Sequence, residues 1–338
     1  MKSKIISVIH QSNVLKNNPL KDPSKREIVI YLPPSYEKSR KNYPVVYLIA
    51  GFTGYGKMNM NVSAFGENIQ QRLDRLMGKK IINEMIVVMP DCFTKYGGSQ
   101  YVNSTATGKY EDYVIKEVVP LTDDLFRTIP KASSRCIIGK SSGGYGAMWL
   151  GMRHPDIFGL LATHSGDSAF EYCYSKDFPP FTVQIQKFGK GHKAVQNFIR
   201  AQVNNKQPKS REFFNIINIL AMSACYSPNP KRKEYNFDLP FDIYTGEVIP
   251  EIWKKWMQFD PVQLIDKYKQ NLKKLKMIYI DCGTRDEFNL QAGARIYADK
   301  LRKAGIKCVH EEFNDGHMNI QYRYDVSLKY ISKHFSYK

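Results

Sequence analysis

Long hydrophobic runs are missing from this sequence of 338 residues. The longest nearly continuous apolar run, Val45–Phe52, is far shorter than the ~20 residues that cross a membrane as a helix. The apolar stretch near the N-terminus ends at His10, before it reaches the ~7–15 residues of the hydrophobic region of a secretory signal. We therefore expect a cytoplasmic protein without a membrane partner.

Closely spaced cysteine pairs are missing as well. The six cysteines are widely separated along the chain, and none forms a C-x-x-C pair. Several lie inside or beside apolar runs that are typical of strands. We interpret them as buried free thiols rather than as disulfide partners or zinc ligands.

Acidic residues are in the minority: 32 Asp and Glu stand against 50 Lys and Arg, which gives a formal net charge of +18. The basic residues are scattered, and no run reaches the ~5–8 residues of a nucleic-acid patch. We therefore expect no nucleic-acid partner. Lysines such as Lys187, Lys190, Lys193 and Lys231–Lys233 would favour an anionic substrate if they line the entrance to a site.

Short β-branched runs alternate with longer amphipathic segments along the chain, except in one long connection without strand patterns. Apolar runs without alternation, such as Val45–Ile49, are typical of strands that are buried on both faces of a parallel sheet. Helical spacing covers residues 110–127 and 290–304. This order predicts an α/β fold with a doubly wound, mostly parallel sheet. The expected strands are Glu27–Leu32, Pro44–Ala50, Glu84–Pro90, Arg135–Gly139, Phe158–His164, Leu275–Cys282 and Ile306–Phe313.

The connection between His164 and Leu275 is far longer than the usual ~2–6 residues. It is rich in aromatic residues and in Pro, Asn and Lys, and it contains helical patterns over residues 194–203 and 213–224. A separate domain is one interpretation. The lack of strands favours a helical cap, residues 168–270, inserted into a single domain that spans residues 1–338.

The segment Gly139-Lys140-Ser141-Ser142-Gly143 matches the pattern G-x-S-x-G between an expected strand and an expected helix. This is the setting of a nucleophile elbow, in which a serine lies on a strained turn and the residues two before and two after it must be small. Ser141 meets this condition, whereas Ser142 has Lys140 two residues before it. The alternative is a glycine-rich turn without chemistry.

A serine nucleophile needs a neighbouring base that is itself oriented by a carboxylate. In this setting the order along the chain is serine, acid, histidine. His317 lies in a loop before the last expected helix, and His164 is its rival because it also ends a strand. Asp286 follows an expected strand end. We expect Asp281, inside that strand, to accept backbone hydrogen bonds, and Glu287 is the second choice of acid.

A second backbone donor for the oxyanion should come from the loop after an early strand. The glycine-rich turn 50–56 follows the apolar run that ends at Ile49, so the N–H of Phe52 can pair with that of Ser142. Glycine-rich turns also bind phosphates. No Walker ending and no G-x-G-x-x-G unit accompanies this one, so we expect no nucleotide cofactor.

Together these segments resemble the esterase D, or "Putative esterase", family of α/β-hydrolases, and most closely its enterochelin esterase-like branch. The resemblance implies an α/β-hydrolase fold, a triad of Ser141, Asp286 and His317, and an oxyanion hole built from the N–H groups of Phe52 and Ser142. Many members have His-Gly where this chain has Ala-Gly at 50–51. The segments that carry the resemblance are 44–56, 91–111, 139–147, 164–167, 281–286 and 315–317, and residues 97–104 resemble the loop that flanks the family's pocket.

The expected function is hydrolysis of a small-molecule carboxylic ester through an acyl-enzyme intermediate, without a metal or an organic cofactor. Two alternatives use the same triad: thioester hydrolysis, as in S-formylglutathione hydrolases, and acyl transfer, as in mycolyltransferases. A catalytically silent α/β-hydrolase fold that serves as a binding protein is the alternative from a different class. The sequence carries no signal of an oligomeric state.

Overall fold

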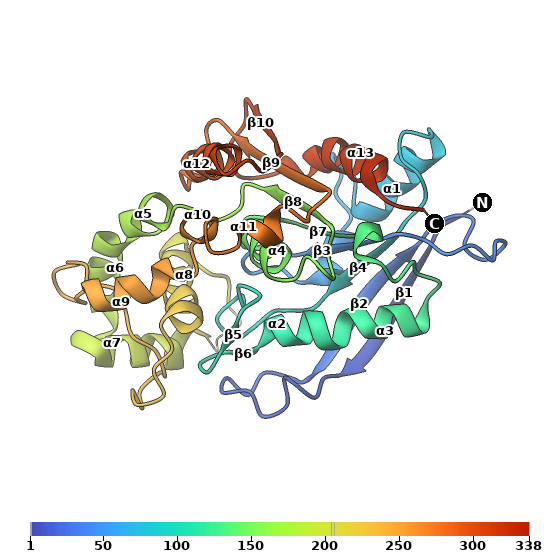
Figure 1. The fold of residues 1–338 in the computed structure, drawn as a ribbon. Coiled ribbons are helices and arrows are strands. Elements are labelled where there is room, and N and C mark those ends of the chain that lie inside the picture. The colour runs from blue at the N-terminus through green and yellow to red at the C-terminus, as the bar shows by residue number, and fades with distance from the viewer. Residues whose placement is uncertain (1, 204, 206, 338) are drawn as a thin grey trace.

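A computed structural model describes residues 2–203, 205 and 207–337. Its centre is an eight-stranded sheet in the order β1-β2-β4-β3-β7-β8-β9-β10 (Figure 1). The pairs β1–β2 and β2–β4 are antiparallel, and every other neighbouring pair is parallel. The strands are β1 (Lys4–Gln11), β2 (Lys25–Leu32), β3 (Val45–Ile49), β4 (Ile86–Pro90), β7 (Arg135–Lys140), β8 (Leu160–His164), β9 (Met277–Gly283) and β10 (Val309–Phe313).

The mostly parallel sheet confirms the predicted fold class, and each expected strand forms with its ends shifted by a few residues at most. Strand β1 was not expected. It pairs with β2 along one edge of the sheet, and its residues are exposed or half-buried rather than buried. An edge strand of this kind lacks the continuous apolar run that marks the central strands.

Two apolar layers lie on opposite faces of the sheet, because successive residues of a strand point to opposite sides. Val46 and Leu48 of β3 pack into the layer that contains α1 (Ile69–Gly78) and α13 (Tyr324–His334). Tyr47 between them belongs to the layer on the other face. Both faces of the sheet are therefore covered, as the apolar runs predict.

The second face carries the helices that were expected around the site. Helix α4 (Ser142–Arg153) follows β7, and α12 (Leu290–Lys303) ends before Gly305, which has a φ of 74°. The expected helix over 110–127 forms in three parts: α2 (Tyr110–Asp112), a π-helical stretch (Tyr113–Val118) and α3 (Val119–Leu125). Shorter elements are β5 (Asn103–Ser104), β6 (Gly108–Lys109) and the 3₁₀ turns Gly56–Met60, Ala132–Ser134 and Ile320–Arg323.

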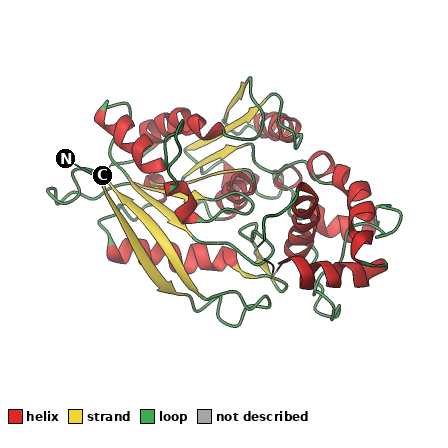
Figure 2. Cartoon of the chain, turned by 180° about the vertical axis from the view of Figure 1, so that it is seen from behind, coloured by secondary structure: helices red, strands yellow, loops and turns green. Residues whose placement is uncertain are grey.

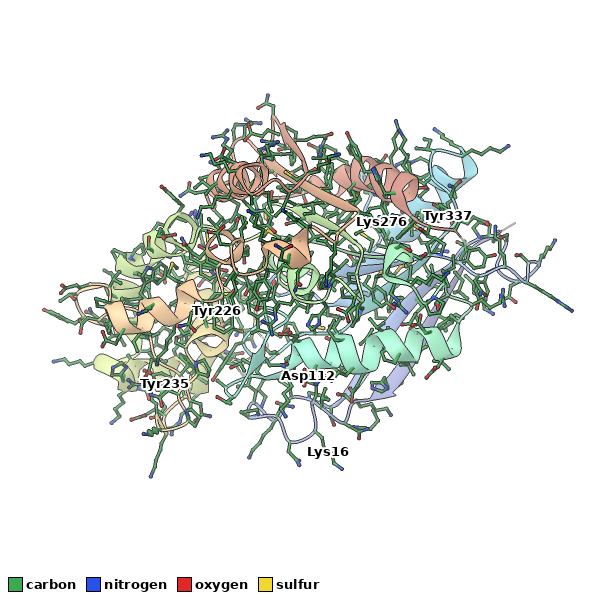
Figure 3. All side chains as sticks on the ribbon, in the orientation of Figure 1. Lys16, Asp112, Tyr226, Tyr235, Lys276 and Tyr337 are labelled. Carbon is green, nitrogen blue, oxygen red and sulfur yellow. The ribbon has the colours of Figure 1, made fainter. Side chains whose placement is uncertain are left out.

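The chain between β8 and β9, which we call the β8–β9 segment, is helical, and its helices gather beside the sheet (Figure 2). Rings of the segment contact rings of α4: the ring centroids of Tyr226 and Tyr145 are 5.7 Å apart, and those of Phe259 and Trp149 are 5.3 Å apart. Tyr226 is labelled in Figure 3. The single domain with a cap over 168–270 stays a prediction. The segment contains α5 (Phe170–Cys173), α6 (Phe178–Ile185), α7 (Gly191–Phe198), α8 (Arg211–Tyr226), α9 (Pro250–Met257), α10 (Pro261–Leu264), α11 (Lys269–Leu272), the 3₁₀ turns Ser175–Asp177 and Gln186–Phe188 and the π-helical stretch Ile199–Val203.

The six cysteines are free thiols, five of them buried and Cys308 half-buried, as predicted. Within the described residues, no helix combines the length and the apolar character needed to cross a membrane.

Candidate active site

Ser141 lies on a tight turn between β7 and α4. Its backbone has φ 58° and ψ −128°, a conformation that residues with side chains rarely adopt, and its N–H donates to the carbonyl oxygen of His164 at 2.9 Å. A Cβ at Gly139 would lie 2.4 Å from the carbonyl carbon of Gly143, and a Cβ at Gly143 would lie 2.4 Å from the carbonyl oxygen of Ile49. The turn therefore has the crowding that the G-x-S-x-G pattern predicts.

The two adjacent serines of the turn differ in their surroundings. Ser142 is only 3% exposed, and its hydroxyl donates to Oδ2 of Asp167 at 3.1 Å. Ser141 is half-buried at the tip of the turn. Because Ser142 is the first residue of α4, its backbone N–H has no acceptor within the helix. The pair thus offers one accessible hydroxyl, on Ser141, and one backbone donor beside it.

His317 and Asp286 form a buried pair at the carboxyl edge of the sheet. Nδ1 of His317 lies 2.8 Å from Oδ2 of Asp286, and the two residues are 4% and 3% exposed. The other carboxylate oxygen accepts the N–H of Phe288 at 3.0 Å. Burial opposes ionisation of Asp286, but the hydrogen bond and charge of His317 outweigh it and lower the pKa of that carboxyl. Asp286 is therefore a carboxylate at neutral pH.

The residues around this pair fix the position of the imidazole. Glu287, the second choice of acid, accepts the backbone N–H of His317 at 2.7 Å instead of contacting its ring. The ring of Phe288 packs edge-on against the imidazole, with 4.8 Å between the ring centroids. The imidazole ring of His317 therefore contacts Asp286, whereas Glu287 contacts only the backbone of His317.

Strand order carries Ser141 and Asp286 to the same edge, because β7, β8 and β9 are parallel neighbours. Ser165, which follows β8, lies between them. Its hydroxyl is 3.3 Å from the thiol of Cys282, and that thiol donates to Oδ2 of Asp286 at 3.7 Å. The backbone N–H of Ser165 also donates to the carbonyl oxygen of Asp281 at 2.8 Å.

The loop after β3 lies against the elbow. A Cβ at Gly51 would lie 3.0 Å from the carbonyl oxygen of Lys140 and 3.4 Å from Cβ of Ser141. Phe52 is the next residue of this loop. Its backbone is therefore close to the turn that carries Ser141, as the predicted oxyanion site requires.

Residues 97–104, which the sequence places beside the pocket, hold this loop. The N–H of Thr53 donates to the carbonyl oxygen of Gly97 at 2.7 Å. The hydroxyl of Tyr101 donates to the carbonyl oxygen of Ala50 at 2.5 Å. A Cβ at Gly97 would lie 3.0 Å from the ring of Phe52, so the ring would have to move by a few tenths of an ångström, and the φ of 100° at this position also favours glycine. Residues 97–104 therefore contact the loop after β3, and their place beside a substrate pocket stays a prediction.

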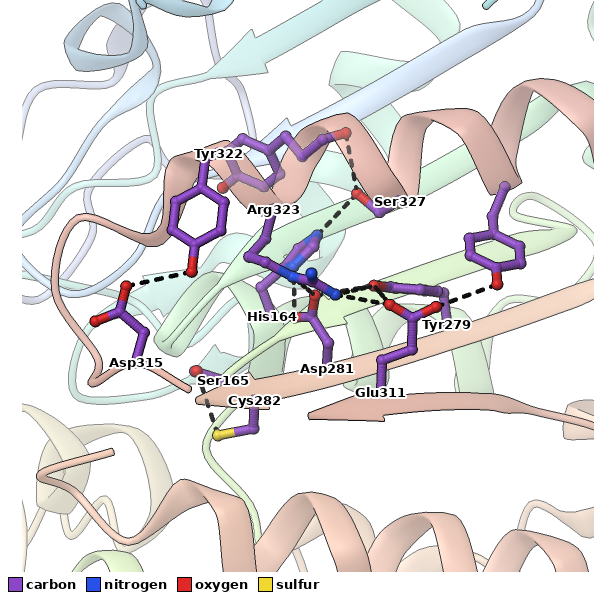
Figure 4. Close-up of polar contacts among 12 residues, drawn as sticks. His164, Ser165, Tyr279, Asp281, Cys282, Glu311, Asp315, Tyr322, Arg323 and Ser327 are labelled. Atoms are coloured by element: carbon purple, nitrogen blue, oxygen red, sulfur yellow. Dashed lines mark hydrogen bonds and ion pairs between the residues drawn. The ribbon is translucent and has the colours of Figure 1, made fainter. Parts of the chain in front are cut away.

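His164 and Asp281 form a second buried histidine–carboxylate pair, shown in Figure 4. Nδ1 of His164 lies 2.6 Å from Oδ1 of Asp281, and its Nε2 lies 2.9 Å from the hydroxyl of Ser327. The other oxygen of Asp281 accepts the Tyr279 hydroxyl and Nε of Arg323, both at 2.9 Å. The prediction that the Asp281 side chain accepts backbone hydrogen bonds is therefore wrong.

The two candidate histidines differ in how their ring nitrogens are engaged. Both ring nitrogens of His164 are engaged, and the residue is 1% exposed. His317 uses Nδ1 for Asp286, and no hydrogen bond to its Nε2 forms within the described part of the chain. Of the two, His317 has the ring nitrogen that is free to take a proton.

Asp167 is a further buried carboxylate beside the elbow, and the sequence pattern assigned it no role. Its Oδ2 accepts the hydroxyls of Ser142 and Tyr174, at 3.1 and 2.8 Å, and Nε2 of Gln100 at 3.2 Å. Burial raises the pKa of Asp167, while these hydrogen bonds and the charge of His317 act against the rise. Its position just past β8, at the edge where the other site residues gather, is the signal that could have found it.

A cavity of about 920 Å³ opens at the opposite edge of the sheet, where β3 and β4 begin. Tyr43, Pro44 and Glu84 are among its lining residues, and none of the predicted site residues is. Ligands of open α/β sheets bind beyond the carboxyl ends of the strands, so the edge with Ser141 is the better candidate. Across residues 2–203, 205 and 207–337, no three His, Cys, Asp or Glu side chains are grouped to hold a metal ion.

Comparison with protein families and curated proteins gives several matches. The family model described as "Putative esterase" matches residues 23–328. The uncharacterized protein YbbA of Bacillus subtilis (strain 168) is 28% identical over 174 residues, which are 47% of this chain and 66% of YbbA. Esterase Rv1288 of Mycobacterium tuberculosis is 29% identical over 141 residues, 41% of this chain and 29% of Rv1288. The chain thus spans just under two thirds of one relative's length and under a third of the other's.

Solved structures with the same fold cover almost the whole chain. A ferulic acid esterase has a TM-score of 0.62 and 20% identity, with 99% of both chains covered. The S-formylglutathione hydrolase FrmB of Staphylococcus aureus has a TM-score of 0.59 and 16% identity over 98% of this chain and 100% of its own. The enterobactin esterase FES of Shigella flexneri has a TM-score of 0.54 and 14% identity over 98% and 59%. These likenesses confirm the α/β-hydrolase fold.

Proposed function

Because the chain belongs to the "Putative esterase" family, we propose that it is a serine hydrolase that cleaves carboxylic esters. The observation that carries the proposal is the buried pair of His317 and Asp286, 2.8 Å apart, at the sheet edge that also carries Ser141. In this proposal Ser141 is the nucleophile, His317 the general base and Asp286 the carboxylate that orients it.

The reaction runs in two halves. The hydroxyl of Ser141 attacks the acyl carbonyl carbon while Nε2 of His317 takes its proton. The backbone N–H groups of Phe52 and Ser142 receive the negative oxygen of the tetrahedral intermediate. His317 then protonates the leaving alcohol, which leaves an acyl ester on Ser141. A water molecule activated by the same imidazole releases the acid and restores the serine.

Three features of the site support these roles. The low pKa of Asp286 keeps a negative charge next to Nδ1 of His317, which favours the tautomer with its proton on Nδ1 and stabilises the imidazolium. The positive φ of Ser141 turns its side chain away from the helix that follows. The first-turn N–H of Ser142 has no acceptor within α4 and is available to an oxyanion.

Active-site labelling tests the proposal. A fluorophosphonate probe should label the wild-type protein and the Ser142→Ala variant, but not the Ser141→Ala variant. His317→Ala should lose ester turnover by about 10⁴–10⁶-fold, because the serine then lacks its base. Equal labelling of Ser141→Ala and wild type would refute the assignment. Absence of labelling in all variants would favour the catalytically silent fold.

Thioester hydrolysis and acyl transfer use the same groups, so they stay predictions within this proposal. A panel that contains p-nitrophenyl esters of different lengths, S-formylglutathione and an added acceptor alcohol separates the three reactions. The cytoplasmic location predicted from the N-terminus stays a prediction as well.

Lys176 is a further candidate for the positive charge that would favour anionic esters, beside the lysines named from the sequence. Lys187 pairs with Glu212 at 2.8 Å on the surface of the β8–β9 segment. Lys176, in contrast, donates to the carbonyl oxygen of Glu287 at 2.8 Å and lies 5.5 Å from the ring of Phe288, which packs on His317. We propose that Lys176 supplies the local positive charge at the entrance.

A further inference from the structure

We propose that Gln100 and Asp167 form a hydrogen-bond acceptor subsite beside the oxyanion loop, and that this subsite binds a neutral hydroxyl group of the substrate. The inference rests on the proposed ester hydrolysis and deepens it, since it names hydroxylated esters as the substrate class. The two side chains are 1% and 6% exposed. They come from different parts of the chain, the loop after β4 and the turn after β8.

Asp167 is a buried carboxylate whose direct partners are neutral. The charge of His317 acts on it from a distance, but no Lys, Arg or His nitrogen of the described residues forms an ion pair with it. Three neutral donors, from Ser142, Tyr174 and Gln100, compensate its burial, and all of them reach Oδ2. No hydrogen bond to Oδ1 forms in the described chain. A carboxylate with an acceptor oxygen to spare is costly to bury unless a ligand completes it.

Gln100 adds a second free acceptor. Its Nε2 donates to Asp167 and to the hydroxyl of Tyr226, the latter at 3.0 Å. Its Oε1 is buried and has no partner in the part of the chain that the structure describes. The opposite orientation of the amide would set Oε1 against the Asp167 carboxylate, where two acceptors would repel each other. The free atom of Gln100 is therefore the oxygen.

The free oxygen lies next to the site of the reaction. A Cβ built at Gly98 would be 3.9 Å from Oε1 of Gln100 and 3.2 Å from Cδ2 of Phe52. Oε1 of Gln100 thus lies on the side of the Phe52 loop, and its Nε2 donates to Asp167, which also accepts the hydroxyl of Ser142. Phe52 and Ser142 supply the two proposed oxyanion donors. The backbone of Gln100 has a φ of 49°, a costly conformation that points this side chain inward.

The chemistry of the two acceptors selects the ligand. An amide oxygen and a carboxylate both need a donor, so an anionic group would be repelled. An ammonium group would suit the carboxylate, but the net charge of +18 opposes the approach of a cation. A neutral hydroxyl, alcoholic or phenolic, has one proton and donates it to one of the two acceptors without bringing a charge. The hydroxyls of Tyr174 and Tyr226 can rotate to adjust to it.

The test compares esters that differ in one group. Methyl 3-phenylpropionates with hydroxyl, methyl, carboxylate or aminomethyl at the ring 4-position are measured with the wild type, Gln100→Met, Asp167→Asn and the surface variant Gln263→Met. We expect the hydroxyl ester to exceed its methyl analogue by at least about tenfold in kcat/KM, mainly through KM. This preference should fall to near unity in the two subsite variants and persist in Gln263→Met.

Other outcomes overturn the inference. Equal kcat/KM for the hydroxyl and methyl esters would mean that water alone occupies the subsite. A preference for the aminomethyl ester would assign a cationic ligand instead. Fluorophosphonate labelling of the same samples keeps the two proposals apart. Labelling with no hydroxyl preference refutes the subsite only, whereas loss of Ser141-dependent labelling refutes the proposed function. Since Asp167→Asn preserves shape, it tests the subsite even if Gln100→Met does not fold.

Discussion

A single methyl group at Gly139 should disable the elbow without touching a reacting atom. In Gly139→Ala, the new Cβ would lie 2.4 Å from both the carbonyl carbon and the carbonyl oxygen of Gly143. Non-bonded carbon atoms prefer about 3.5–4.0 Å, so the two backbone segments must separate by about 1 Å. Neither contact belongs to a flexible side chain that could move aside. The turn that carries Ser141 and the Ser142 N–H must therefore shift.

A shift of this size has a predictable kinetic cost. A misplacement of about 1 Å in catalytic groups lowers the rate by about 10²-fold, which corresponds to about 2.7 kcal/mol. We expect kcat/KM of Gly139→Ala on a p-nitrophenyl ester to fall by about this factor. Fluorophosphonate labelling should slow in parallel, because it depends on the same serine geometry.

Substitutions at two further glycines should cause smaller losses of activity, in proportion to the crowding at each position. A Cβ at Gly51 would lie 3.0 Å from the carbonyl oxygen of Lys140, which demands only a few tenths of an ångström, so Gly51→Ala should lose less than about tenfold. Gly78, at the end of α1, has nothing within 4 Å of its virtual Cβ, so Gly78→Ala should keep full activity. Circular dichroism and thermal melting confirm that each variant is folded. Wild-type kcat/KM in folded Gly139→Ala, or an equal loss in all three variants, would refute the reasoning.

Two further predictions concern charge. Burial opposes the ionisation of Asp281, but His164 and Arg323 outweigh it and hold its pKa below the ordinary value. The ion pair therefore contributes stability above pH ~3.9, and this contribution is lost as the pH falls through the lower folded pKa. In urea unfolding between pH 3 and 7, the free energy of unfolding of Asp281→Asn should fall less steeply with acid than that of the wild type. At neutral pH the variant should be less stable by about 3–5 kcal/mol. Identical pH slopes of the unfolding free energy for the two proteins would contradict this. If Lys176 attracts anionic esters, their KM should rise with salt while that of neutral esters stays constant, and Lys176→Gln should abolish the difference.

The central strands and the elbow could be predicted because their signals are local. The run Val45–Ile49 is apolar throughout, and the spacing of Gly139 and Gly143 around Ser141 follows from one steric contact in a tight turn. Strand β1 was missed because an edge strand with alternating exposure has no such run. The π-helical stretch inside the expected helix over 110–127 leaves no mark on the hydrophobic pattern.

The long-range polar contacts could not be predicted from single positions. Asp281 finds its partners in His164, on a neighbouring strand, and in Arg323, beyond the last strand. Asp167 becomes a member of the site only because Gln100 and Tyr174 fold over it. Such contacts depend on tertiary packing that brings distant segments together. The roles of the site residues stay predictions until the labelling experiment is done.

The network around Asp281 has a consequence for the order in which the protein is made. During synthesis, His164 and Asp281 leave the ribosome before Arg323 and Ser327, which complete their hydrogen bonds. Until Arg323, which directly precedes α13, is released and docks together with this helix, the fully buried carboxylate of Asp281 lacks its guanidinium partner. The strands of the sheet can then pair, but the charge of Asp281 is not yet compensated. The nascent chain therefore becomes a stable protein only when its C-terminal helix docks, and truncations that remove this helix should yield chains that are degraded rather than partly active enzymes.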